Sequence, residues 1–226
     1  MELANTFSFQ YLEEIIDNAL NHGYNFMTLR DYYRKSAPKD QCFVLRLDLD
    51  FKPRGLQPFL DLAQRKKIPL TIFVRVAGPY NIFGYDCFPL LKTAHECSHE
   101  IGLHTTPVEW ATINNVDIER SFAAELDTLR QWFPVFGIAP HRDINYAYNS
   151  LPWLRKHWES LRSRYSLEYH AYEDCLEKSP IYVNEGLSPH VGWRSHEPTS
   201  VISTGRSIHM LLHPHWWYEK HPFEIQ

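Results

Sequence analysis

The residues best suited to chemistry lie in the segment RLDLDF, residues 46–51, which carries two carboxylates in a short apolar run. Side chains of a β-strand alternate between its two faces, so Arg46, Asp48 and Asp50 share one face. A divalent metal ion and an acid–base reaction both require carboxylates that lie close together in this way. The same alternation is also typical of a solvated antiparallel strand, and this segment alone does not decide between the two.

Three further segments end a short apolar run with a metal-ligating or acid–base side chain. They are HEIGLH (99–104), PHRD (140–143) and LLHPHWW (211–217). If the carboxyl ends of these strands meet at one mouth with residues 46–51, their side chains form a hydrolytic metal site. Asp50 and His104 are then the metal ligands with the most support, and Asp48 and His213 are acid–base candidates.

Hydrophobic periodicity predicts the elements that position these residues. Helices are expected over residues 9–21, 55–67 and 117–133, and another is expected to be capped by Ser150. Strands are expected over 42–49, 70–76, around 101–104 and over 135–140, with further short apolar runs near 165–169, 181–183, 201–203 and 208–212. This alternation predicts an α/β fold with a closed or nearly closed parallel barrel. Residues 1–226 form one domain in this prediction, with residues 1–40 as an N-terminal helical extension packed on the barrel.

Composition excludes several classes of function. The 226 residues carry a formal net charge of −4 and no block of lysine or arginine, which argues against a nucleic-acid partner. No apolar run approaches the roughly 20 residues that a membrane span needs. The N-terminus lacks a basic region followed by an apolar core, so a cytoplasmic protein is expected. The four cysteines form no Cys-x-x-Cys pair and are expected to be reduced.

Four motifs in order resemble those of the polysaccharide deacetylase family, also called carbohydrate esterase family 4. They are LRLDLD (45–50), HEIGLHT (99–105), PHRD (140–143) and IHMLLHP (208–214). The resemblance implies a distorted (β/α) barrel, here of about seven parallel strands, and one divalent metal ion used to deacetylate N-acetyl sugars. It implies that Asp48 is the general base, Asp50 and His104 are metal ligands, Arg142 orients the base and His213 is the general acid.

The chain departs from this family pattern at two places. Val108 occupies the position of the family's second histidine ligand, and valine cannot bind a metal. The acidic residue that supports the general acid in the family has only an imperfect match here, at residues 184–185. His141 is our hypothesis for the replacement ligand, because it ends the strand predicted over 135–140. His99 and water are the rivals, although the odd spacing of His99 and His104 places the two histidines on opposite faces of a strand.

These expectations lead to one leading function and several alternatives. The leading function is removal of an acyl group, preferably acetyl, from the nitrogen of an amino sugar, with zinc or another first-row metal. The lack of an export signal favours a small glycan, sugar-nucleotide or lipid-linked sugar as substrate, and the oligomeric state stays open. The alternatives are a deformylase or other C–N amidase on the same barrel, and a non-catalytic carbohydrate-binding descendant with an incomplete metal site.

Several residues also have structural explanations. Asp48 could pair with Arg46 or Arg142 instead of acting as a base, and His213 could be a core histidine bonded to a carbonyl. Trp216 and Trp217 could stack on a sugar ring or seal the barrel against the N-terminal helix.

Overall fold

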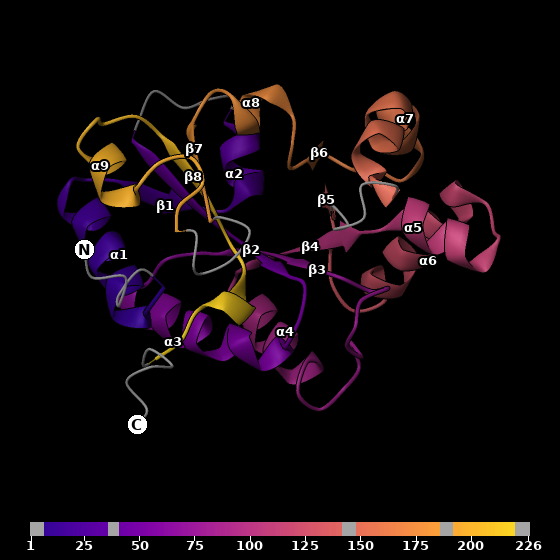
Figure 1. Cartoon of the computed structure of the whole chain (residues 1–226), viewed down its shortest axis with the longest axis horizontal. Coiled ribbons are helices and arrows are strands. Elements are labelled where there is room, and N and C mark those ends of the chain that lie inside the picture. Colours follow the sequence, from indigo (N-terminus) through magenta and orange to yellow (C-terminus); the bar gives the residue numbers. More distant parts are fainter. Residues whose placement is uncertain (1–6, 36–40, 142–147, 186–191, 220–226) are drawn as a thin grey trace.

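Helices and parallel strands alternate along the computed structural model, which describes residues 7–35, 41–141, 148–185 and 192–219 (Figure 1). The strands are β1 (Asn25–Met27), β2 (Cys42–Leu49), β3 (Thr71–Val74), β4 (Glu100–Thr105), β5 (Gly137–Pro140), β6 (Tyr169–His170), β7 (Ile181–Asn184) and β8 (Ile208–Leu212). The α-helices are α1 (Phe9–Asn21), α2 (Leu29–Arg34), α3 (Leu56–Lys66), α4 (Phe88–Glu96), α5 (Pro107–Asn114), α6 (Ile118–Arg130), α7 (Ser150–Arg164), α8 (Asp174–Glu177) and α9 (Pro198–Ile202). Two short 3₁₀ helices are η2 (Pro53–Gly55) and η4 (Pro214–Trp216).

The strands form one sheet in the order β6-β5-β4-β3-β2-β8-β7, and β1 pairs with the first residues of β2. Every pairing between these strands is parallel. The sheet curls into a half-barrel, and the predicted single-domain, distorted (β/α) barrel is confirmed. Because all strands run in the same direction, their carboxyl ends meet at one end of the half-barrel.

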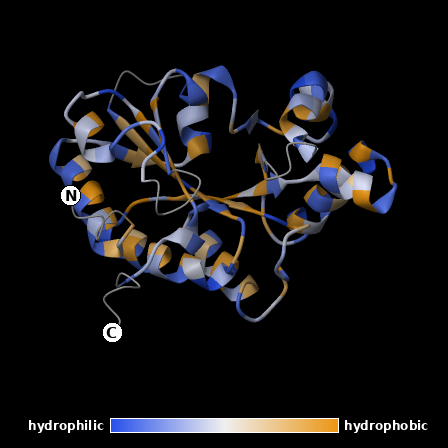
Figure 2. Cartoon of the chain, viewed as in Figure 1, coloured by the Kyte–Doolittle hydropathy of each residue, from blue (hydrophilic) through white to orange (hydrophobic). Residues whose placement is uncertain are grey.

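Apolar side chains cover both faces of the curled sheet. All eight residues of β2 and all four of β3 are buried, as expected for central strands of a parallel sheet. Hydrophobic residues concentrate on the central strands, and hydrophilic residues on the outer faces of the helices (Figure 2). Helices α3 and α4 run along one side of the sheet, and α5, α6 and α7 gather at one end of the molecule (Figure 1). Of the described helices, none combines the length and apolarity that crossing a bilayer requires.

The helix predictions are largely confirmed, with small shifts at the ends. Helix α1 has the predicted bounds and is capped by the Ser8 hydroxyl, which accepts a hydrogen bond from the Tyr11 backbone N–H. Helix α6 begins after its acidic cap Asp117. Helix α7 is capped by Asn149 rather than by Ser150 as predicted, because Ser150 is already the first helical residue and the Asn149 side chain accepts a hydrogen bond from the Leu151 N–H.

The strand predictions differ from the structure at three places. The apolar run 201–203, counted among the strand candidates, belongs to α9, because Glu197 caps a helix there and Pro198 favours its first turn. The strand expected near 165–169 is β6, which begins only at Tyr169. The N-terminal region expected to be helical also contains β1, which pairs with β2.

Candidate metal centre

Asp50, His104 and His141 come together at the carboxyl ends of β2, β4 and β5. Their ligand atoms all lie within 4.8 Å of one another. Asp50 Oδ1 is 3.1 Å from His104 Nε2 and 3.7 Å from His141 Nε2. The structure therefore brings together the three residues that the sequence predicts as ligands, and as a group they could hold a metal ion.

Hydrogen bonding around His104 fits a cation at this place. The Nδ1 atom of His104 lies 2.8 Å from the Ala139 carbonyl oxygen, and since a carbonyl only accepts, Nδ1 carries the proton. The other ring nitrogen, Nε2, therefore faces Asp50 Oδ1 and also Asp48 Oδ2, which is 3.4 Å away. Asp50 Oδ1 itself is buried and has no hydrogen-bond partner in the described part of the chain. A cation placed between these atoms would satisfy all of them.

The spacing of the donors also suits a transition-metal ion. Zinc binds imidazole nitrogen and carboxylate oxygen at about 2.1 Å in a tetrahedron, which places neighbouring donors about 3.4 Å apart. The separations from Asp50 Oδ1 to the two imidazoles fall on either side of that value. Burial raises the pKa of Asp50, but the nearby His104 and His213 outweigh this and hold it well below its usual range. Asp50 is therefore ionised, as a ligand must be.

His141 is present in the neutral form that binds metals. Burial lowers its pKa to about 3, and the neighbouring His104 and Arg75 add to this effect. Its Nδ1 atom is buried and has no hydrogen-bond partner among the described residues. A neutral imidazole without competing bonds is a suitable third ligand in place of Val108. Val108 lies in α5, where its backbone N–H donates to the Ser150 hydroxyl.

His213 faces the same centre from the end of β8, and a buried carboxylate holds it. Its Nδ1 lies 2.7 Å from Glu185 Oε2, and its backbone N–H donates to the same oxygen over 2.8 Å. Its Nε2 lies 3.7 Å from Asp50 Oδ2. Burial alone would lower the pKa of His213, but Glu185 and then Asp50 raise it to about 9. His213 is therefore an imidazolium at neutral pH, and its partner is a carboxylate rather than a carbonyl.

No family model, curated protein or solved structure matches this chain.

Asp48 is held by Arg46, which corresponds to one of the structural alternatives. Arg46 donates from Nε to Oδ1 over 2.8 Å and from Nη2 to Oδ2 over 2.7 Å, and both residues are fully or almost fully buried. The guanidinium lies between the rings of Phe73 and Tyr172 and also donates to the Tyr172 hydroxyl. Burial raises the pKa of Asp48, but Arg46 and His104 lower it below its usual value. Arg142, predicted to orient Asp48, lies outside the described residues.

The rival ligand His99 lies away from the centre. It precedes β4, at the opposite end of that strand from His104, and its Nδ1 accepts a hydrogen bond from the Leu70 N–H over 3.1 Å.

Trp217 is buried against Phe7, Phe9 and Phe59, so it seals the N-terminal helix to the barrel. Trp216 is half-buried, and its ring centroid lies 4.6 Å from that of His213.

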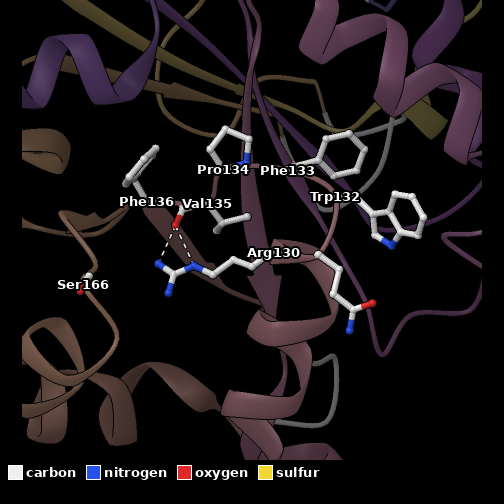
Figure 3. Close-up of a pocket in the computed structure, with 8 residues that line it drawn as sticks. Arg130, Trp132, Phe133, Pro134, Val135, Phe136 and Ser166 are labelled. Carbon is white, nitrogen blue, oxygen red and sulfur yellow. Dashed lines mark hydrogen bonds between the residues drawn. The ribbon is translucent and has the colours of Figure 1, made fainter.

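A surface hollow of about 500 Å³ between α6 and β5 contains no group suited to catalysis (Figure 3). Arg130 is the charged residue of its lining, and its guanidinium donates to the carbonyl oxygens of Val135 and Tyr165. The other lining residues are mainly apolar or aromatic. The hollow also lies at the amino end of β5, whereas His141 follows its carboxyl end. The candidate centre is therefore elsewhere.

Sequence reasoning selected the three residues of the candidate centre but missed several of the residues around them. Glu185 was only an imperfect match to a supporting acid, although it lies just beyond the apolar run 181–183, after Asn184. Arg75 was not singled out, although it is the one charged residue in the predicted strand 70–76. A charge inside an otherwise apolar strand is the signal that could have marked it.

Proposed function

We propose that this chain is a metal-dependent hydrolase of amide C–N bonds other than peptide bonds, and that it removes an acetyl group from the nitrogen of an amino sugar. The observation that carries the proposal is the Asp50–His104–His141 group, largely buried, beside the imidazolium of His213. The four motifs that resemble polysaccharide deacetylases support the choice of reaction. The substrate would be a small glycan, a sugar-nucleotide or a lipid-linked sugar.

Each residue has a chemical task in this proposal. Asp50, His104 and His141 would hold one divalent ion, and their two imidazoles favour zinc or another first-row metal. Such an ion, when bound, lowers the pKa of water and polarises a carbonyl. Asp48 is ionised and directs Oδ2 toward His104, so it would take the proton of the attacking water while Arg46 keeps its orientation fixed.

His213 would complete the reaction as the general acid. Glu185 holds Nδ1 and so fixes the ring, which leaves the Nε2 proton directed toward Asp50 and the centre. That proton would pass to the amine nitrogen as its bond to the acyl carbon breaks, so that an acid and a free amine leave. A purely carbohydrate-binding descendant has little use for an ionised base and a charged acid on either side of a ligand set.

Metal binding is the first test of the proposal. Wild type, Asp50→Ala, His141→Ala and His99→Ala would be titrated with zinc by calorimetry, after circular dichroism has shown that each is folded. We expect about one ion per chain in wild type and in His99→Ala, with binding lost in Asp50→Ala and weakened at least about tenfold in His141→Ala. Unchanged zinc binding in Asp50→Ala would remove the basis of the proposal.

Turnover is the second test, and it separates the related reactions. A panel of acylated amino sugars and cyclic amides would be assayed for release of acetate, formate and ammonia. We expect acetate, whereas formate or ammonia alone would indicate a deformylase or another amidase. On the accepted substrate, Asp48→Asn and His213→Ala should each lower kcat by roughly two to four orders of magnitude, as for loss of a general base or acid. Near-normal rates in both variants would make these two residues structural.

A further inference from the structure

Arg75 lies beside the candidate metal centre, directly after the end of β3. Leu49 of β2 pairs with Val74 of β3, and Val74 pairs with Leu103 of β4. One step further along this register, Arg75 falls between two of the proposed ligands, Asp50 and His104. Arg75 is also two residues after Phe73, whose ring lies inside the half-barrel, so strand alternation turns Arg75 toward the inside as well.

The side chain of Arg75 is buried and has no partner among the residues that the structure describes. The residue is only 7% exposed, and its Nε atom is buried with no hydrogen-bond partner in that part of the chain. No described residue forms a side-chain hydrogen bond or an ion pair with it; only its backbone N–H is bonded, to the Tyr80 hydroxyl over 3.0 Å. Arg46, a second buried arginine, differs because it has both oxygens of Asp48 as partners, although its Nη1 has none among the described residues.

One buried carboxylate near Arg75, that of Glu125, is already engaged elsewhere. Glu125 is close enough for Arg75 to lower its pKa, although burial raises that pKa more. Its carboxylate, however, accepts hydrogen bonds from the Thr105 hydroxyl and from the backbone and hydroxyl of Thr106. A buried cation is normally paired, and one beside a metal site is further disfavoured when the metal is bound. An anionic ligand at the centre would supply the missing partner.

We propose that Arg75 binds a carboxylate or phosphate group of the substrate, so that the natural substrate of this centre is an acylated amine that also carries an acid group. The planar guanidinium offers two parallel N–H donors, which match the two oxygens of either group. The position of Arg75 between Asp50 and His104 puts the acid group within one arginine side chain of the bond to be hydrolysed. This inference rests on the proposed function and specifies the substrate class of that same site.

The first experiment needs neither metal nor turnover. Chelator-treated wild type, Arg75→Met, Arg75→Lys and Arg120→Met would be titrated with inorganic phosphate and with acetate; Arg120 is an exposed arginine of α6 and controls for net charge. We expect Arg75→Met to bind the preferred anion at least about tenfold more weakly than wild type, with a smaller loss in Arg75→Lys and none in Arg120→Met. The anion that wild type binds more tightly identifies the acid group of the substrate. Equal affinities in wild type and Arg75→Met, or no binding by wild type, would overturn the inference.

The second experiment separates this inference from the proposed function. The zinc-loaded proteins would be assayed for acetate release from N-acetylglucosamine, N-acetylglucosamine 6-phosphate and N-acetylmuramic acid. Arg75→Met should lose the preference for the better anionic compound over the neutral sugar, by about tenfold in the ratio of kcat/KM. An equal loss on all three compounds would instead assign Arg75 to the reacting carbonyl and overturn the inference. If no compound is hydrolysed while the anion titration still depends on Arg75, the deacetylase proposal fails and the anion site stands.

Discussion

At the scale of single residues, the two carboxylates of residues 46–51 have different environments. Both Asp48 and Asp50 are buried and ionised, but Arg46 occupies both oxygens of Asp48, whereas Oδ1 of Asp50 has no hydrogen bond to a described residue. A carboxylate already neutralised by arginine has little charge to offer a metal ion. This difference explains why Asp50 is the ligand candidate and Asp48 the acid–base candidate.

The Arg46–Asp48 pair should be important for stability because it is buried. In metal-free protein, Arg46→Met leaves the Asp48 charge without a partner, and we expect the free energy of unfolding to fall by about 3–5 kcal/mol. The double variant Arg46→Met/Asp48→Leu removes both charges and should be less destabilised than the single variant. Urea denaturation measures the free energy of unfolding of both variants. A loss below about 1 kcal/mol in Arg46→Met would contradict this account of the pair.

The charge of His213 should depend on Glu185. In metal-free protein, NMR titration should show the His213 imidazole with a pKa of about 9, falling in Glu185→Gln to its ordinary value near 6.5 or lower. Because the folded-state pKa is raised, the pair stabilises the fold fully below pH 6.5, and this contribution is lost as the pH rises through about 9. Glu185→Gln should therefore lose stability at pH 6 and less at pH 10.

His170 provides the control for that titration. Burial lowers its pKa to about 4, and it lies in β6, at the opposite edge of the sheet from β7 and Glu185. Its titration should be identical in the two proteins. A His213 pKa that stays near 9 in Glu185→Gln would show that Glu185 is not the cause of its charge.

At the scale of elements, two glycines in neighbouring strands shape the inside of the half-barrel. Gly102 of β4 and Gly137 of β5 leave space that Phe73 and Tyr169 fill, and a Cβ atom at either glycine would collide with those rings. The ring of Phe73 in turn lies against the guanidinium of Arg46. The two glycines therefore leave room for an aromatic layer, the rings of Phe73 and Tyr169, which supports the residues of the candidate centre.

The glycine in β5 offers a test of this layer. Gly137→Ala should lower the free energy of unfolding by about 1–3 kcal/mol, because the added methyl group overpacks the interior against Tyr169. Tyr169→Leu removes the colliding atoms, so the double variant should be less destabilised than the sum of the two single changes. Chemical denaturation of wild type, the two single variants and the double variant gives the four free energies of unfolding that this double-mutant cycle compares. Strict additivity would show that the ring of Tyr169 does not limit the space at Gly137.

At the scale of the whole molecule, the parallel sheet concentrates the chemistry at one end. Four strands, β2, β4, β5 and β8, carry or precede the residues Asp50, His104, His141 and His213 at their carboxyl ends. These residues are up to 163 positions apart in sequence, from 50 to 213. One bound metal ion would therefore join strands from both sides of β3 and favour the folded chain over the unfolded one.

Local pattern alone determined much of this protein. The helical periodicity of residues 9–21 predicts α1, and the alternation in 46–50 puts both carboxylates on one face, because each depends only on backbone geometry within a few residues. The alternation of strands and helices predicts the parallel barrel, and parallel strands bring Asp50, His104 and His141 to the same end. These predictions depend only on the periodicity of side chains and on strand direction, and both can be inferred from a single sequence.

Only the tertiary structure decided which side chains pair. Arg46 holds Asp48, Glu185 charges His213 from 28 positions away, and Arg75 has no partner among the described residues. Trp217 packs on the N-terminal helix instead of on a ligand. Such pairings depend on strand register, on the curl of the sheet and on which volumes are already filled. Those quantities arise from contacts between distant segments, so no local pattern encodes them.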